Sequence, residues 1–122
     1  SYRQVIFQNY LRFGADNIVS YGSQFKPLEW EVNEHKSDDC YAKLVVRKND
    51  PDMPDRVIGF HYLGPDAGEV TQGFAVAIKK GITKLEMDLS VGIHPTRAEV
   101  LHFEMLVPQF VSGCDTHPFS RL

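Results

Sequence analysis

The hydrophobic pattern of the first third of the chain predicts a short helix followed by extended segments. Apolar residues between positions 5 and 13 lie near helical spacing, and Gly14 would end that helix. β-branched and aromatic residues then favour extended chain from 17 to 30. A charged loop over 31–39 closes this part.

Two strand patterns joined by turn residues predict an antiparallel hairpin in the middle of the chain. Residues 40–48 and 56–63 are rich in valine, isoleucine and aromatic side chains. Between them, Asn-Asp-Pro-Asp-Met-Pro-Asp at 49–55 is typical turn chemistry. Gly-Pro-Asp at 64–66 would end the second strand.

The strongest helical pattern covers 67–80. One apolar stripe runs along it, and Gly81 would end the helix. The stripe consists of Val70, Phe74, Ala77 and Ile78. Small residues beside the stripe leave room for close packing against a strand or a partner.

Two Thr-x-x-Glu patterns predict two further helix starts. The first, at 83–86, opens a short helix. The second, at 96–99, opens a last helix that would run to about Leu106 and stop at Pro108. The order of elements predicts an α+β fold, in which an antiparallel sheet carries helices packed on one face.

Composition supports one globular domain without a strong charge. The chain has 122 residues, 43% of them apolar, and a net charge of −3. This balance gives no positive field for nucleic acid or an anionic membrane, and no apolar run reaches the roughly 18 residues of a membrane span. We expect a domain over 1–112 and a flexible tail over 113–122. Two cysteines favour a reduced setting, which we expect to be cytoplasmic, with mitochondria as the alternative.

His94 is the candidate for acid–base chemistry. It precedes Pro95 and lies five residues before Glu99, whose carboxylate could accept a hydrogen bond from one imidazole nitrogen. The other nitrogen would then be available to move a proton. The residues alone leave a second interpretation open, in which Glu99 only closes a capping box with Thr96 and His94 is a turn residue.

The cysteines give weaker signals. Cys40 begins a strand pattern and is predicted to be a buried, inert thiol, whereas Cys114 lies in the tail and could react. The two are far apart, without neighbouring ligands at zinc spacing, so we predict no metal site. The chain contains no Cys-x-x-Cys and no Gly-x-Gly-x-x-Gly motif.

The sequence from about Phe13 to Cys114 resembles the C-terminal domain of flavoprotein disulphide reductases. The segments that carry this resemblance to the glutathione-reductase type are 72–77, 79–84, 92–96 and 98–99. Further segments are similar to the high-molecular-weight thioredoxin reductases, including the fused thioredoxin-glutathione reductases: 27–30, 40–43, 56–65 and 67–71.

This resemblance implies an α+β interface domain that forms a two-fold homodimer. In such enzymes the histidine matching His94, beside Pro95, reaches the partner's flavin and disulphide and acts as the acid–base, while the glutamate matching Glu99 orients it. FAD, NADPH and a thioredoxin-like disulphide substrate would belong to the full-length enzyme. The chain alone is expected to bind neither cofactor and to be inactive, so its own status as an enzyme stays open.

Three departures from the family pattern bear on function. The FAD and NADPH domains and the Cys-x-x-x-x-Cys disulphide are not in this sequence. Cys114 is followed by Asp115, where the family has selenocysteine or cysteine, so Cys114 matches only half of a redox pair. Arg97 stands where small or thiol side chains are usual. The alternative to a catalytic role is a stand-alone dimerisation or regulatory module.

Overall fold

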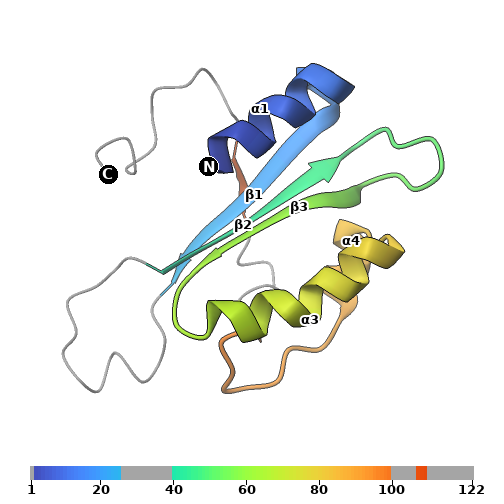
Figure 1. Ribbon diagram of the computed structural model, residues 1–122. Coiled ribbons are helices and arrows are strands. Elements are labelled where there is room, and N and C mark those ends of the chain that lie inside the picture. The colour runs from blue at the N-terminus through green and yellow to red at the C-terminus, as the bar shows by residue number, and fades with distance from the viewer. Residues whose placement is uncertain (1, 26–39, 100–106, 110–122) are drawn as a thin grey trace.

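A four-stranded antiparallel sheet forms the centre of the protein (Figure 1). The structure is a computed structural model that describes residues 2–25, 40–99 and 107–109. The sheet order is β3-β2-β1-β4. The strands are β1 (Ile18–Phe25), β2 (Cys40–Arg47), β3 (Arg56–Leu63) and β4 (Val107–Gln109).

The predicted hairpin is confirmed as β2 and β3. The two strands pair from Tyr41 opposite Leu63 to Arg47 opposite Arg56. The turn between them is organised by a buried carboxylate, Asp50, which accepts hydrogen bonds from the backbone N–H groups of Asp52 and Met53. This local hydrogen bonding is the reason that aspartate is favoured in turns.

Helices form where the hydrophobic pattern predicts them. They are α1 (Tyr2–Phe13), α3 (Ala67–Lys80) and α4 (Lys84–Leu89), with a 3-10 turn η1 (Ala15–Asn17) before β1. Gly81 ends α3 with a φ of 88°, a left-handed conformation that glycine adopts without strain. The predicted capping box opens α4, since the Thr83 side chain accepts from the Glu86 N–H and the Glu86 side chain accepts from the Thr83 N–H.

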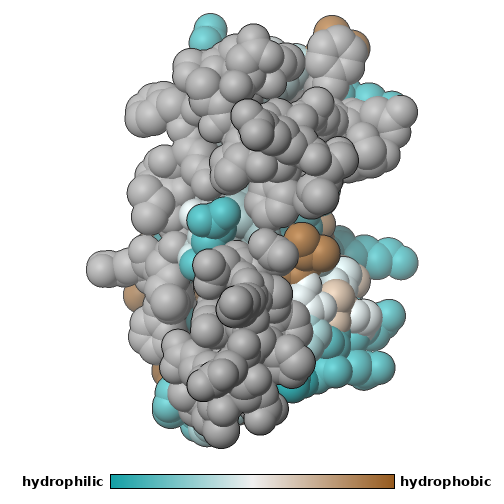
Figure 2. Space-filling view, turned by 90° about the vertical axis from the view of Figure 1, so that its left-hand side faces the viewer, coloured by the Kyte–Doolittle hydropathy of each residue, from teal (hydrophilic) through white to brown (hydrophobic). Residues whose placement is uncertain are grey.

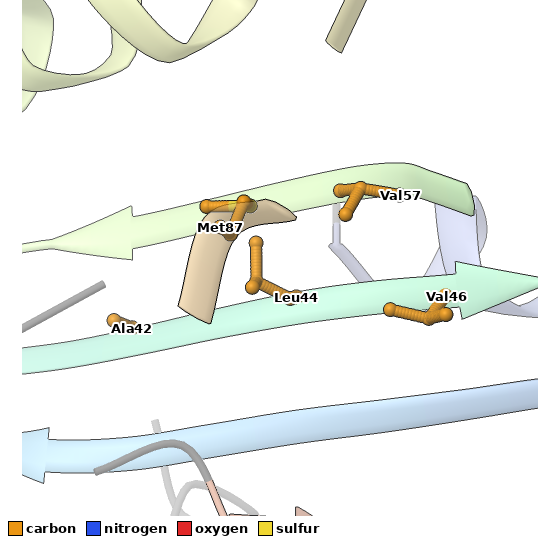
Figure 3. Close-up of a cluster of buried hydrophobic side chains, with 5 residues drawn as sticks. All are labelled: Ala42, Leu44, Val46, Val57 and Met87. Carbon is orange, nitrogen blue, oxygen red and sulfur yellow. The ribbon is translucent and has the colours of Figure 1, made fainter. Parts of the chain in front are cut away.

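The larger hydrophobic core lies between the sheet and α3 and α4. Its buried members are Ala42, Leu44 and Val46 of β2, Val57 of β3 and Met87 of α4 (Figure 3). The alternation of a strand sends every second residue of β2 to this face. Partly buried residues of the predicted stripe of α3 pack against it: Val70, Phe74 and Ile78.

A smaller core lies on the opposite face of the sheet, under α1. Ile18 and Val45 are buried there against Tyr10, Phe13 and Ile58. The predicted α+β fold is therefore confirmed, and α3 and α4 share one face as expected. α1 covers the other face, where Tyr10 and Phe13 pack, so the prediction of helices on one face holds for α3 and α4 and not for α1 (Figure 1).

The C-terminal part differs from the prediction in one described element. Pro108 was expected only as the stop of a helix and no strand was predicted at 107–109, whereas Pro108 lies in β4 and pairs with Tyr21. Proline has no backbone N–H to donate, and β4 is an edge strand, where this loss is tolerated. The predicted helix over 96–106 starts as a turn at 97–98, and residues 100–106 lie outside the described part, as do 26–39 and the predicted tail.

Candidate functional site

The loop that follows α4, residues 91–99, carries the two predicted acid–base residues and is called here the His94 loop. Ser90 closes α4, because its hydroxyl donates to the Glu86 carbonyl at 2.8 Å. The chain then leaves the core: Val91, Ile93 and His94 are all exposed. The peptide bond between His94 and Pro95 is cis.

His94 and Glu99 are in direct contact. The Nδ1 atom of His94 lies 3.2 Å and 3.1 Å from the two carboxylate oxygens of Glu99. With its proton on Nδ1, the imidazole donates to the carboxylate and keeps the Nε2 lone pair for a general base. The His94 side chain is 77% exposed, against 27% for Glu99, so the ring is accessible while its carboxylate partner is largely covered.

The structure adds a contact that sequence analysis missed, the one between Asp66 and Arg97. Arg97, which lies between His94 and Glu99 in the loop, forms an ion pair with Asp66 at the start of α3. Asp66 and Arg97 are far apart in the sequence and follow no shared periodicity, so no pattern could pair them. The available signal was Arg97 itself, an unusual side chain for its place in the family.

His61 has the structural setting expected of it, on a strand of the sheet. It lies in β3 directly opposite Lys43 of β2. Burial lowers the pKa of His61, and the positive charge of Lys43 lowers it further. Both effects favour the neutral form of the ring. The remaining histidines, His35, His102 and His117, lie outside the described residues.

The two cysteines lie in different parts of the chain, Cys40 in the core and Cys114 in the predicted tail. Cys40 is fully buried at the start of β2. Cys114 lies outside the described residues. In the part of the chain that the structure describes, no three of the His, Cys, Asp and Glu side chains gather as a metal would need. Within the same ranges, no helix has the length and apolar character to cross a membrane.

Exposed apolar side chains lie around the candidate site. Leu85 and Leu89 stand one helical turn apart on α4, and Val91 and Ile93 follow in the His94 loop, all at least 64% exposed. In the view of Figure 2, a small apolar area lies among mainly hydrophilic coloured atoms. Exposed apolar residues concentrated in one segment are typical of a contact surface.

The outer side of α3 also leaves room for a close neighbour. A Cβ atom added at Gly68 or Gly73 would meet nothing within 4 Å, and Val76 is 62% exposed. Small residues of this kind allow the backbone of another element to approach closely.

Comparison with known proteins identifies two similarities. The family described as pyridine nucleotide-disulphide oxidoreductase, dimerisation domain, matches residues 12–105. The curated protein thioredoxin reductase SEP1 from Emiliania huxleyi is 57% identical over 100 residues. The alignment covers 82% of this chain and 19% of that protein, so the chain spans about a fifth of its relative's length.

Proposed function

The chain belongs to the dimerisation-domain family of the pyridine nucleotide-disulphide oxidoreductases, and on this premise we propose that it is the interface domain of a thioredoxin-reductase-like enzyme. In this proposal it forms a two-fold homodimer and presents His94 and Glu99 to the flavin and disulphide of the partner subunit. The observation that carries the catalytic part is the contact of His94 Nδ1 with Glu99, which leaves an accessible ring.

The homodimer is supported by surface that a monomer does not need. Leu85 and Leu89 of α4 expose their side chains, and Gly68 and Gly73 leave the outer side of α3 open. A two-fold dimer would place the same patch of each subunit against its copy. Sedimentation equilibrium should therefore show dimers at about 100 μM, which corresponds to an interface of moderate affinity. A strictly monomeric protein would contradict the dimer.

The chemistry assigned to His94 is proton transfer in thiol–disulphide exchange. A thiolate attacks one sulfur of a disulphide, a new sulfur–sulfur bond forms, and the other sulfur leaves as a thiolate. A protonated His94 would give its Nε2 proton to that leaving thiolate, and the neutral ring would then take a proton from the next thiol. Glu99 would stabilise the imidazolium and hold the ring in orientation through Nδ1.

The cofactors FAD and NADPH would be held by other domains. The flavin supplies the electrons that reach the disulphide. His94 and Pro95 fit a contact with a group held elsewhere, because both are exposed in the His94 loop. The substrate proposed for the whole enzyme is a thioredoxin-like protein disulphide. The chain by itself would bind neither cofactor tightly, and purification with stoichiometric flavin would contradict this.

The test of the catalytic proposal is His94→Ala in the intact protein. Turnover per bound flavin should fall about 10²–10⁴-fold, which is the usual contribution of general acid–base catalysis. The melting temperature should hardly change, because the side chain is 77% exposed. Thr96→Ala, an exposed neighbour in the same loop, is the matched control and should keep full activity. Equal activity for His94→Ala and wild type would leave a dimerisation module without a catalytic role.

A further inference from the structure

We infer that Asp66 and Arg97 are positioning residues, whose ion pair fixes the His94 loop to the turn between β3 and α3. The inference rests on the proposed function, because that function gives the position of His94 its importance.

Asp66 occupies the N-cap position of α3, but its side chain does not cap the helix. Aspartate at this position normally accepts a hydrogen bond from the first turn of the helix, with its own backbone extended. Asp66 instead has φ 53° and ψ 29°, in the left-handed region, and its side chain makes no cap hydrogen bond. Its carboxylate pairs with Arg97. The left-handed backbone favours aspartate or asparagine at this position, and the ion pair with Arg97 gives the carboxylate a partner outside α3.

Arg97 marks the point at which the His94 loop returns to the body of the protein. The loop is exposed from Ile93 to Thr96, and from Arg97 to Glu99 it is half-buried. Arg97 lies three residues after His94 and two before Glu99. A contact that fixes Arg97 therefore restricts both partners of the acid–base pair.

The end of β3 forms a close-packed base for this contact. The Gly64 backbone lies against the Tyr62 ring, since an added Cβ would be 3.1–3.3 Å from three Tyr62 atoms. Burial and the nearby Cys40 raise the pKa of Tyr62, while the positive charge of Arg97 lowers it. Arg97 thus acts on Tyr62 in β3 as well as on Asp66 in the following turn. Through Arg97, the His94 loop is therefore connected to the end of β3 and to the turn that follows it.

The pair should control position more than global stability. The side chains of Asp66 and Arg97 are 54% and 30% exposed, and ion pairs with that much solvent contact stabilise a fold little. Proton transfer is more demanding, because a displacement of about 1 Å can reduce a rate greatly. Loss of the ion pair should therefore increase the mobility of the His94 loop while leaving the melting temperature nearly unchanged.

The test uses two conservative single variants in the intact protein. Asp66→Asn keeps a residue that accepts the left-handed backbone, and Arg97→Gln removes the charge but keeps a polar side chain. Asp52→Asn, an exposed carboxylate in the β2–β3 turn, is the control. Hydrogen exchange of peptides spanning 91–99 should become about 1.5- to 5-fold faster in both variants, the range expected for a partly exposed pair. Asp52→Asn should leave it unchanged.

Measurements of turnover distinguish a role in positioning His94 from a general increase in the mobility of the His94 loop. In both single variants, kcat should fall by up to about fivefold while the KM for NADPH stays constant. Loop exchange and kcat that match wild type in both single variants would overturn the inference. Because His94→Ala tests the proposed function by itself, failure of the two ideas can be told apart.

Discussion

Two segments of the protein share the pattern Thr-x-x-Glu and use it differently. At 83–86 the Thr83 hydroxyl accepts from the Glu86 N–H at 3.2 Å, and Glu86 accepts from the Thr83 N–H at 2.8 Å, which closes a capping box. At 96–99 the carboxylate of Glu99 lies 3.1 Å from Nδ1 of His94. One glutamate begins a helix, and the other holds an imidazole.

The surroundings of the two glutamates explain the difference. Glu86 is followed by Met87, which is 1% exposed and fixes α4 to the core, so the helix start is held in place. The His94 loop is exposed from Ile93 to Thr96, and the imidazole of His94 lies within reach of Glu99. A local sequence pattern therefore offers a glutamate several partners, and packing and neighbours decide among them.

The largest expected difference between the segments is in stability. Met87→Ala should destabilise the fold by about 2–5 kcal/mol, because it removes a buried side chain and leaves a cavity. Ile93→Ala, in the His94 loop, should change the free energy of unfolding by less than about 0.5 kcal/mol. Urea unfolding of both variants measures this. Similar losses would mean that the loop is packed as tightly as α4.

The next difference is in turnover. Glu99→Gln should slow the intact enzyme on the order of 10- to 100-fold, the contribution of a hydrogen bond to a charged group, and less than His94→Ala does. Glu86→Gln should leave turnover per bound flavin unchanged, because its carboxylate only caps α4. Steady-state rates normalised to flavin measure both. Equal rates for the two variants would show that Glu99 has no catalytic part.

A smaller difference is expected for the two threonines. Thr83→Ala removes the side chain that accepts from the Glu86 N–H and should cost about 0.5–2 kcal/mol. Thr96→Ala should cost less than about 0.5 kcal/mol, since Thr96 is exposed in the His94 loop. Thermal unfolding followed by circular dichroism compares them. Equal losses would indicate that Thr96 also caps a helix.

The smallest effect is a dependence of stability on pH. Hydrogen bonds from the backbone and side chain of Thr83 lower the pKa of Glu86 below its ordinary 4.5, against a weaker opposing effect of burial. Since the folded pKa is depressed, this stabilisation is present above pH 4.5 and is lost as pH falls through the folded pKa. Unfolding free energies of wild type should fall more steeply below that pH than those of Glu86→Gln. Identical pH profiles would contradict the assignment.

Local patterns were sufficient for the central elements of the fold. The strands over 40–47 and 56–63 and the helix over 67–80 follow from residue periodicity and turn residues, which act within a few positions. The contact of His94 with Glu99 also follows from short spacing. Its catalytic use remains a prediction.

Longer-range features could not be obtained in this way. Pro108 resembles a helix stop, and only its pairing with Tyr21 in a sheet edge makes it a strand residue. The contact of Asp66 with Arg97 joins two turns that meet only after β3 and α3 have formed. Both depend on tertiary packing, which overrides local preference.

The buried thiol of Cys40 can report the opening of the sheet through its rate of chemical labelling. Its side chain has no exposed surface, and its strand pairs with β1 on one side and β3 on the other. An alkylating reagent can therefore reach the sulfur only while the chain around this end of β2 is open, and when reclosing is faster than alkylation the rate of labelling measures the free energy of opening. Labelling Cys40 at rising reagent concentrations would report how often this end of the sheet opens.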